Sequence, residues 1–188
     1  GQKGTVQTKS AAELQALTLL GGREGVPRLD EVLDLVAGRV PLLIEIKDQD
    51  GALGPDVGPL EAAVAGDLAR YRGPVALMSF NPHAVAALAD LAPEVPRGLT
   101  TCDFSAQDWP IVPAARRRAL AAMPDVTGVG ASFVSHDARD LASGHVAALK
   151  ARGLPVLCWT IRSPEAEAEA RRVADNVTFE GYAAALPR

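Results

Sequence analysis

The sequence predicts an α/β protein built on a parallel β-sheet. Short aliphatic runs alternate along the 188 residues with longer segments of helical periodicity, at roughly 25 to 30 residues for each pair. Glycine and proline, which number 17 and 14, punctuate the joints between these segments. Strands that alternate with helices are joined by right-handed crossovers, so we expect a sheet that is either open and doubly wound or closed into a barrel.

The first elements are two predicted helices and a strand. Ser10 and Glu13 have the spacing of a capping box, which predicts a helix that ends before Gly21. A second helix is predicted over residues 29–37, where apolar side chains recur on one face. Residues 41–47 then form a short β-branched and aliphatic run, which is typical of a strand.

The same alternation continues to the end of the chain. Five further strands are predicted at residues 75–80, 97–101, 126–133, 155–161 and 176–180. Helices are predicted at residues 61–71, 82–92, 114–123, 141–152 and 164–173. Asn81 and Ser163 precede two of these helices and are the residue types that accept hydrogen bonds from a helix N-terminus.

Composition and missing motifs exclude several classes of protein. The 19 basic and 23 acidic residues give a net charge of −4, which argues against a nucleic-acid or anionic-membrane partner. The sequence holds no membrane span and no leader pattern, so a cytoplasmic location is expected. Cys102 and Cys158 lack zinc-site spacing and are predicted to be buried thiols. No glycine-rich phosphate loop follows the first strand, which favours a barrel over a nucleotide-binding fold.

The strand at residues 41–47 carries the first chemical signal. Glu45 and Lys47 lie on one face of it because side chains alternate along a strand. A buried carboxylate is costly unless it is paired or binds a metal, so a structural ion pair and a functional site explain this pair equally well. Barrel active sites lie at the carboxyl ends of the strands, where Glu45 stands. Asp48 and Asp50 could add oxygen ligands for a hard cation, although acidic loops are more often only solvated.

Four segments resemble a known family in the same order along the chain. They are residues 25–33, 43–47, 79–82 and 153–161. These segments resemble the approach to the third strand, the third strand, the end of the fourth strand and the seventh strand of the glycerophosphodiester phosphodiesterases. That family consists of metal-dependent (β/α)8 TIM-type barrel enzymes, which hydrolyse glycerophosphodiesters to glycerol 3-phosphate and an alcohol.

The resemblance implies roles for four residues. Glu45 matches the family's metal-binding glutamate, and the implied cofactor is a divalent cation, Mg²⁺ or Ca²⁺. Lys47 matches a lysine that meets the substrate phosphate. Trp159 matches an aromatic side chain that lines the substrate pocket, and Phe80 stands near the same mouth. Without the resemblance, both aromatic residues are explained by ordinary core packing.

The chain departs from the family pattern at its N-terminal end. The family's His-Arg-Gly motif, its Glu-x-Asp metal pair and a second histidine are absent. Six strands are predicted where the barrel needs eight, so residues 1–188 are expected to form one barrel domain without its first two βα units. The catalytic residues are therefore unknown. None of the three histidines, His83, His136 and His145, is assigned to catalysis, and His136 is expected in a surface loop.

The sequence leaves three hypotheses for function. The first is metal-dependent hydrolysis of a small glycerophosphodiester substrate by the complete protein. The second is a truncated, non-catalytic barrel that acts as an assembly or binding module. The third is a related phosphate-handling barrel with another diester substrate. Because a six-stranded sheet has two unpaired edges, an N-terminal fragment or a second copy is expected to complete the barrel.

Overall fold

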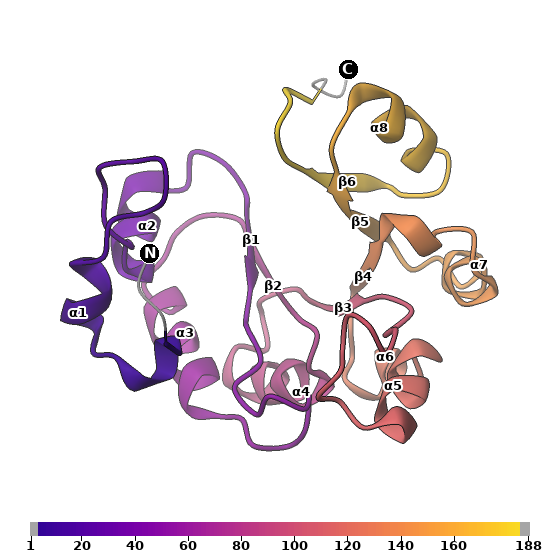
Figure 1. Cartoon of the computed structure of the whole chain (residues 1–188), viewed down its shortest axis with the longest axis horizontal. Helices are drawn as coiled ribbons and strands as arrows, with labels where there is room; N and C mark the ends of the chain where they lie inside the picture. Colours follow the sequence, from indigo (N-terminus) through magenta and orange to yellow (C-terminus); the bar gives the residue numbers. More distant parts are fainter. Residues whose placement is uncertain (1–3, 185–188) are drawn as a thin grey trace.

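The computed structural model describes residues 4–184 as one curved parallel sheet with helices on its outer side (Figure 1). The sheet order is β1-β2-β3-β4-β5-β6, and each strand pairs in parallel with the next one in the sequence. The strands are β1 (Leu42–Glu45), β2 (Val75–Ser79), β3 (Arg97–Thr101), β4 (Phe133–Asp137), β5 (Val156–Ile161) and β6 (Asn176–Phe179).

The helices precede β1 or connect successive strands. The α-helices are α1 (Ala11–Gln15), α2 (Leu29–Val36), α3 (Pro59–Leu68), α4 (Pro82–Leu91), α5 (Ala114–Ala121), α6 (Asp125–Gly128), α7 (Gly144–Ala151) and α8 (Pro164–Ala170). Two 3₁₀ helices are η1 (Val6–Thr8) and η2 (Ala138–Asp140). The predicted N-caps are confirmed, because the side chains of Asn81 and Ser163 accept hydrogen bonds from the first turns of α4 and α8. No helix within residues 4–184 is long and apolar enough to cross a membrane.

Two aromatic side chains report the curvature of the sheet. Phe80 directly follows β2, and Trp159 lies on β5, with β3 and β4 between them. Neighbouring strands are about 4.8 Å apart, so a flat sheet would separate the two backbones by about 14 Å. The ring centroids of Phe80 and Trp159 are only 5.5 Å apart. The sheet therefore curls toward the face on which these rings meet, as the wall of a partial barrel does.

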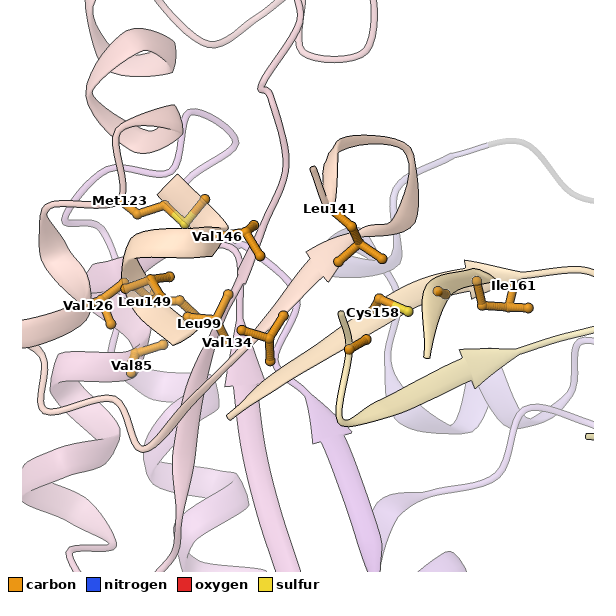
Figure 2. Packing of buried hydrophobic residues seen from close by; sticks show 13 residues of the cluster. Val85, Leu99, Met123, Val126, Val134, Leu141, Val146, Leu149, Cys158 and Ile161 are labelled. Atoms are coloured by element: carbon orange, nitrogen blue, oxygen red, sulfur yellow. The ribbon is translucent and has the colours of Figure 1, made fainter. Parts of the chain in front are cut away.

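Two apolar clusters fill the space between the sheet and the helices. Six buried residues from β2, the helices α2 to α4 and the position directly after β1 form the smaller cluster: Leu33, Ile46, Val64, Leu68, Leu77 and Leu88. Figure 2 shows the larger cluster, in which residues of β3, β4 and β5 pack against α7 and neighbouring segments. Cys158 belongs to this cluster, and Cys102 is also buried, so the prediction of buried free thiols is confirmed.

The predicted strand at residues 126–133 is wrong. Its first part is the short helix α6, and β4 begins only at Phe133. Residues 126–129, Val-Thr-Gly-Val, predict a strand because their β-branched side chains suit one. In the structure, Val126 packs into the larger core from a helical turn instead. The shift places His136 inside β4 with none of its surface exposed, so the expectation of a surface loop is also wrong.

The first predicted helix is shorter than expected. The sequence predicts a helix that runs to about residue 20, whereas α1 ends at Gln15. The chain then turns back, and Thr18 forms an antiparallel bridge with Gly25. The backbone N–H of Leu19 donates to the carbonyl of Glu24 in the same turn. These hydrogen bonds replace the helical ones that a longer α1 would have made.

Gly98 fills a position on β3 at which any side chain would strike an aromatic ring. It pairs in register with Phe133, and a Cβ atom at residue 98 would lie 2.4 Å from that ring. We expect Gly98→Ala to lower the free energy of unfolding by about 1–3 kcal/mol, because overpacking forces a buried ring to move. Urea denaturation measures the change. Gly66→Ala is the control, since its Cβ meets nothing within 4 Å and alanine favours the helix there. Equal stability of Gly98→Ala and the unmodified protein would contradict the expected clash.

Candidate functional site

The four predicted site residues share the concave face of the sheet. Glu45 ends β1, Phe80 follows β2 and Trp159 lies on β5. Their neighbours in the sequence, such as Ile46 and Cys158, pack into the outer clusters toward the helices. Because side chains alternate along a strand, the predicted site residues point to the opposite, inner side. The carboxyl ends of parallel strands lie at one rim, which is where a barrel places its active site.

Glu45 and Lys47 form an ion pair at this rim. The Nζ atom of Lys47 donates to Oε1 of Glu45 across 2.8 Å. The Lys47 side chain is 75% exposed and that of Glu45 is 22% exposed. The predicted common face is thus confirmed. Within the described residues, Oε2 of Glu45 has no hydrogen-bond partner, so this carboxylate can still accept a ligand.

The acidic loop after β1 is held by its own backbone. Asp48 Oδ2 accepts hydrogen bonds from the N–H groups of Gly51 and Leu53. Asp50 accepts three backbone N–H bonds, and bonds of this kind, from Gly54 first, hold the pKa of its carboxyl below the usual value. These carboxylates fold the loop. Residues 4–184 contain no group of three histidine, cysteine or acidic side chains placed to hold a metal ion.

Glu45 alone therefore supplies only one fitting ligand for a divalent cation. Mg²⁺ and Ca²⁺ prefer several oxygen ligands, and the other carboxylates near β1 are occupied by backbone hydrogen bonds. The described residues do not complete a metal site.

Four aromatic rings pack together at the rim. Phe80 contacts Trp159 at 5.5 Å, Trp109 at 5.0 Å and Phe104 at 6.3 Å between ring centroids. The indole Nε1–H of Trp159 donates to the carbonyl of Ser135 across 3.1 Å, which fixes the orientation of the indole. Sequence reasoning missed Phe104 and Trp109 because they lie in the long segment between β3 and α5.

The loop after β1 packs beneath these rings. Leu53 is 1% exposed and lies in a cluster with Cys102, Phe104, Val112 and Leu120. Its carbonyl accepts a hydrogen bond from Arg116 of α5, at 2.9 Å. The segment that follows Glu45 and Lys47 is therefore anchored to the apolar cluster that contains Phe104 and to α5.

Asp137 is a buried acid that the sequence reasoning missed. It ends β4, pairs in register with Trp159 and is 4% exposed. Arg139 donates to it through Nε at 3.0 Å and through Nη2 at 2.6 Å. Burial raises the pKa of Asp137, but the hydrogen bonds from Arg139 outweigh it and the net shift is downward. The same ion pair raises the pKa of Arg139. The misplaced strand boundary at 126–133 hid this residue, since Asp137 then seemed to lie in a loop.

None of the three histidines is placed on the inner face. His136 Nδ1 lies 2.8 Å from Oγ1 of Thr101, and Nε2 lies 3.1 Å from Oδ2 of Asp140. It shares a strand face with Val134, which packs toward the helices. His83 lies in the first turn of α4, and His145 lies in α7.

Comparison with known proteins gives the family. The model of the glycerophosphoryl diester phosphodiesterase family matches residues 1–178. The chain belongs to this family. A comparison with curated proteins found no match.

Solved structures of glycerophosphodiester phosphodiesterases share the fold. A glycerophosphoryl diester phosphodiesterase from Silicibacter pomeroyi is 27% identical to this chain, with a TM-score of 0.64. The match covers 83% of this chain and 54% of the Silicibacter protein. An Oleispira antarctica phosphodiesterase in complex with the product sn-glycerol-3-phosphate is 22% identical, with a TM-score of 0.69 over 94% and 68%. A glycerophosphodiester phosphodiesterase from Parabacteroides distasonis is 20% identical, with a TM-score of 0.67 over 93% and 68%. This chain thus spans between 54% and 68% of the length of these three proteins.

Proposed function

We propose that the complete protein hydrolyses glycerophosphodiesters to glycerol 3-phosphate and an alcohol, with the help of Mg²⁺ or Ca²⁺. The observation that carries the proposal is the Glu45–Lys47 pair on the inner rim of a chain that belongs to this family. The glycerol 3-phosphate product bound to the Oleispira antarctica relative supports the substrate class. A cytoplasmic location stays a prediction.

Each predicted site residue has a role that its placement supports. Glu45 supplies one carboxylate ligand, and the cation polarises a phosphoryl oxygen when it is bound. Lys47 is largely exposed, so its ammonium group can turn to the phosphate and stabilise negative charge on the remaining oxygens. Trp159 and Phe80 pack against the glycerol or alcohol carbons and exclude water from one side of the site.

The proton-transfer groups come from outside the described residues. Among the described residues, β1 and β6 each pair on one side only, and two more βα units at these open edges would complete an eight-stranded barrel. An N-terminal fragment or a second copy can fill this place and bring the family's histidines to the rim. Without such a complement, the chain is expected to be a non-catalytic assembly module, which is the alternative function.

Release of glycerol 3-phosphate tests the proposal. The protein is purified with any fragment that accompanies it, its intact mass is measured, and it is incubated with several glycerophosphodiesters. We expect release that requires Mg²⁺ or Ca²⁺ and stops when a chelator removes them. Absence of hydrolysis by an assembly large enough to hold eight strands would contradict the enzyme and favour the assembly module. Hydrolysis of other phosphodiesters alone would favour a related phosphate-handling barrel.

A further inference from the structure

An apolar groove lies on the outer side of the sheet, between the segment around η2 and helix α8. Its volume is about 470 Å³, which falls within the range of small-ligand pockets, roughly 300 to 1,000 Å³. Its apolar lining includes Leu141, Ala142, Ile161, Ala166, Ala170 and Val173. The groove is therefore large enough for a small molecule and suits an apolar one.

The floor and both walls of the groove are apolar. The floor is formed by Leu141 and Ile161, which are 8% and 2% exposed and belong to the larger apolar cluster (Figure 2). Ala166 and Ala170 lie one turn apart on α8, so they share a face of that helix. Ala142 lines the groove from the segment after η2. A methyl group on each wall leaves the space between the walls open.

The groove is continuous with the inner rim of the sheet. A second hollow of about 290 Å³ lies at the carboxyl ends of β4 and β5 and is lined by Trp159, one of the predicted site residues. Four residues line both the hollow and the groove: Ala138, Arg139, Thr160 and Arg162. A molecule bound at the rim can therefore extend between η2 and the end of β5 into the groove.

The charged side chains at this junction are compensated by carboxylates. Arg139 pairs with Asp137 at 2.6 Å, and Arg162 pairs with Glu180 at 2.7 Å. Glu169, which also lines the groove, pairs with an arginine of its own helix end, and its side chain is 70% exposed. An apolar chain that passes this junction meets the aliphatic stems of the arginines and displaces no unpaired charge.

We propose that the groove binds the acyl chain of a monoacyl glycerophosphodiester, so that lysophospholipids belong to the substrate class. The inference rests on the proposed function, because it extends the substrate of that same site. An occupant that enters from the rim has to be narrow, apolar and attached to the diester, and an acyl chain on the glycerol meets all three conditions. Each methylene group that is fully buried strengthens binding by about fourfold.

Two substrates that differ only by the acyl chain test the inference. The kcat/KM for 1-decanoyl-lysophosphatidylcholine is compared with that for glycerophosphocholine in the complete, metal-loaded protein, below the concentration at which micelles form. We expect the monoacyl diester to be favoured by about tenfold or more, since two buried methylene groups suffice for this. The ratio should rise from a hexanoyl to a decanoyl chain. A ratio near one would overturn the inference and leave the proposed function intact.

Variants that fill the groove locate the acyl chain. Ala166→Leu should lower kcat/KM for the monoacyl diester severalfold and leave that for glycerophosphocholine unchanged. Ala142→Leu fills the groove from the opposite wall and should act in the same way. Ala168→Leu is the matched control, because Ala168 is exposed on the same helix and does not line the groove. Equal substrate ratios in the Ala166→Leu and Ala168→Leu variants would overturn the assignment.

Binding without hydrolysis separates failure of the inference from failure of the proposed function. The methyl resonances of Ile161 are followed by NMR while 1-decanoylglycerol or glycerol is added. A shift with the ester alone, which Ala166→Leu weakens, supports the groove even if no diester is hydrolysed, a result that would reject the proposed function only. No shift with the ester, an equal shift with glycerol, or a shift that Ala166→Leu leaves unchanged overturns the assignment.

Discussion

Replacing Glu45 with glutamine is expected to lower glycerophosphodiester hydrolysis at limiting Mg²⁺ by about 100-fold, the scale on which metal-site changes act. The amide keeps the size of the side chain but removes the charge that attracts a cation. Because the Glu45 side chain is 22% exposed and its partner Lys47 is 75% exposed, the broken ion pair should cost little stability, about 1 kcal/mol or less. The measurement is the initial rate as a function of Mg²⁺ concentration.

Two further variants show whether Glu45 is a metal ligand or only the ion-pair partner of Lys47. Glu94→Gln changes an exposed carboxylate after α4 in the same way and should leave the metal dependence unchanged. Lys47→Gln breaks the same ion pair but retains the carboxylate, so it should raise KM for the diester without a matching change in the metal requirement. If Glu45→Gln has the same rate as the unmodified protein at limiting metal, Glu45 is only the partner of Lys47.

Asn81→Ala is expected to reduce the free energy of unfolding by about 2–4 kcal/mol, because one side chain makes three hydrogen bonds there. Asn81 is fully buried, and its Oδ1 caps α4 by accepting from the N–H of His83 at 2.9 Å. Its Nδ2 donates to Asp48 Oδ1 and to the carbonyl of Gly54, both at 2.8 Å. Alanine leaves these acceptors without their donor and releases the loop after β1. Thermal and urea denaturation measure the loss.

The control for Asn81→Ala is a helix-capping residue whose side chain makes only the capping hydrogen bond. The Ser143 side chain caps α7 by accepting from the N–H of Val146, and Ser143→Ala should cost about 1 kcal/mol. If Asn81→Ala costs no more than Ser143→Ala, the bonds to Asp48 and Gly54 contribute nothing. We also expect Asn81→Asp to be no more stable than Asn81→Ala, because a buried carboxylate oxygen would replace the donating amide and face Asp48 Oδ1 and the Gly54 carbonyl.

Local chemistry made much of the fold predictable. Asn81 and Ser163 cap their helices through bonds to residues two and three positions away, and such bonds need no tertiary information. The shared face of Glu45 and Lys47 follows from strand alternation alone. The same reasoning gave the wrong structure for residues 126–133. Their β-branched content favours a strand, whereas Val126 is buried in the larger cluster from the short helix α6.

The second half of the rim could not be predicted from local patterns. Arg139 and Arg162 are 23 positions apart by number and meet at one pocket only because β4 and β5 pair in parallel. Asp137 resembles an ordinary loop acid until β4 is placed correctly. The metal requirement stays a prediction, and the described residues hold no group of three ligands around Glu45.

The anchoring of Leu53 bears on how substrate range can change within this scaffold. The loop that carries it begins directly after Lys47, and its apolar tip is buried beneath the aromatic rings. Insertions or deletions there would move Lys47, for which we propose a phosphate contact, and would expose the cluster around Leu53, so natural drift and laboratory evolution should both leave the length of this loop unchanged. The side chains of Arg139 and Arg162, by contrast, are 72% and 69% exposed.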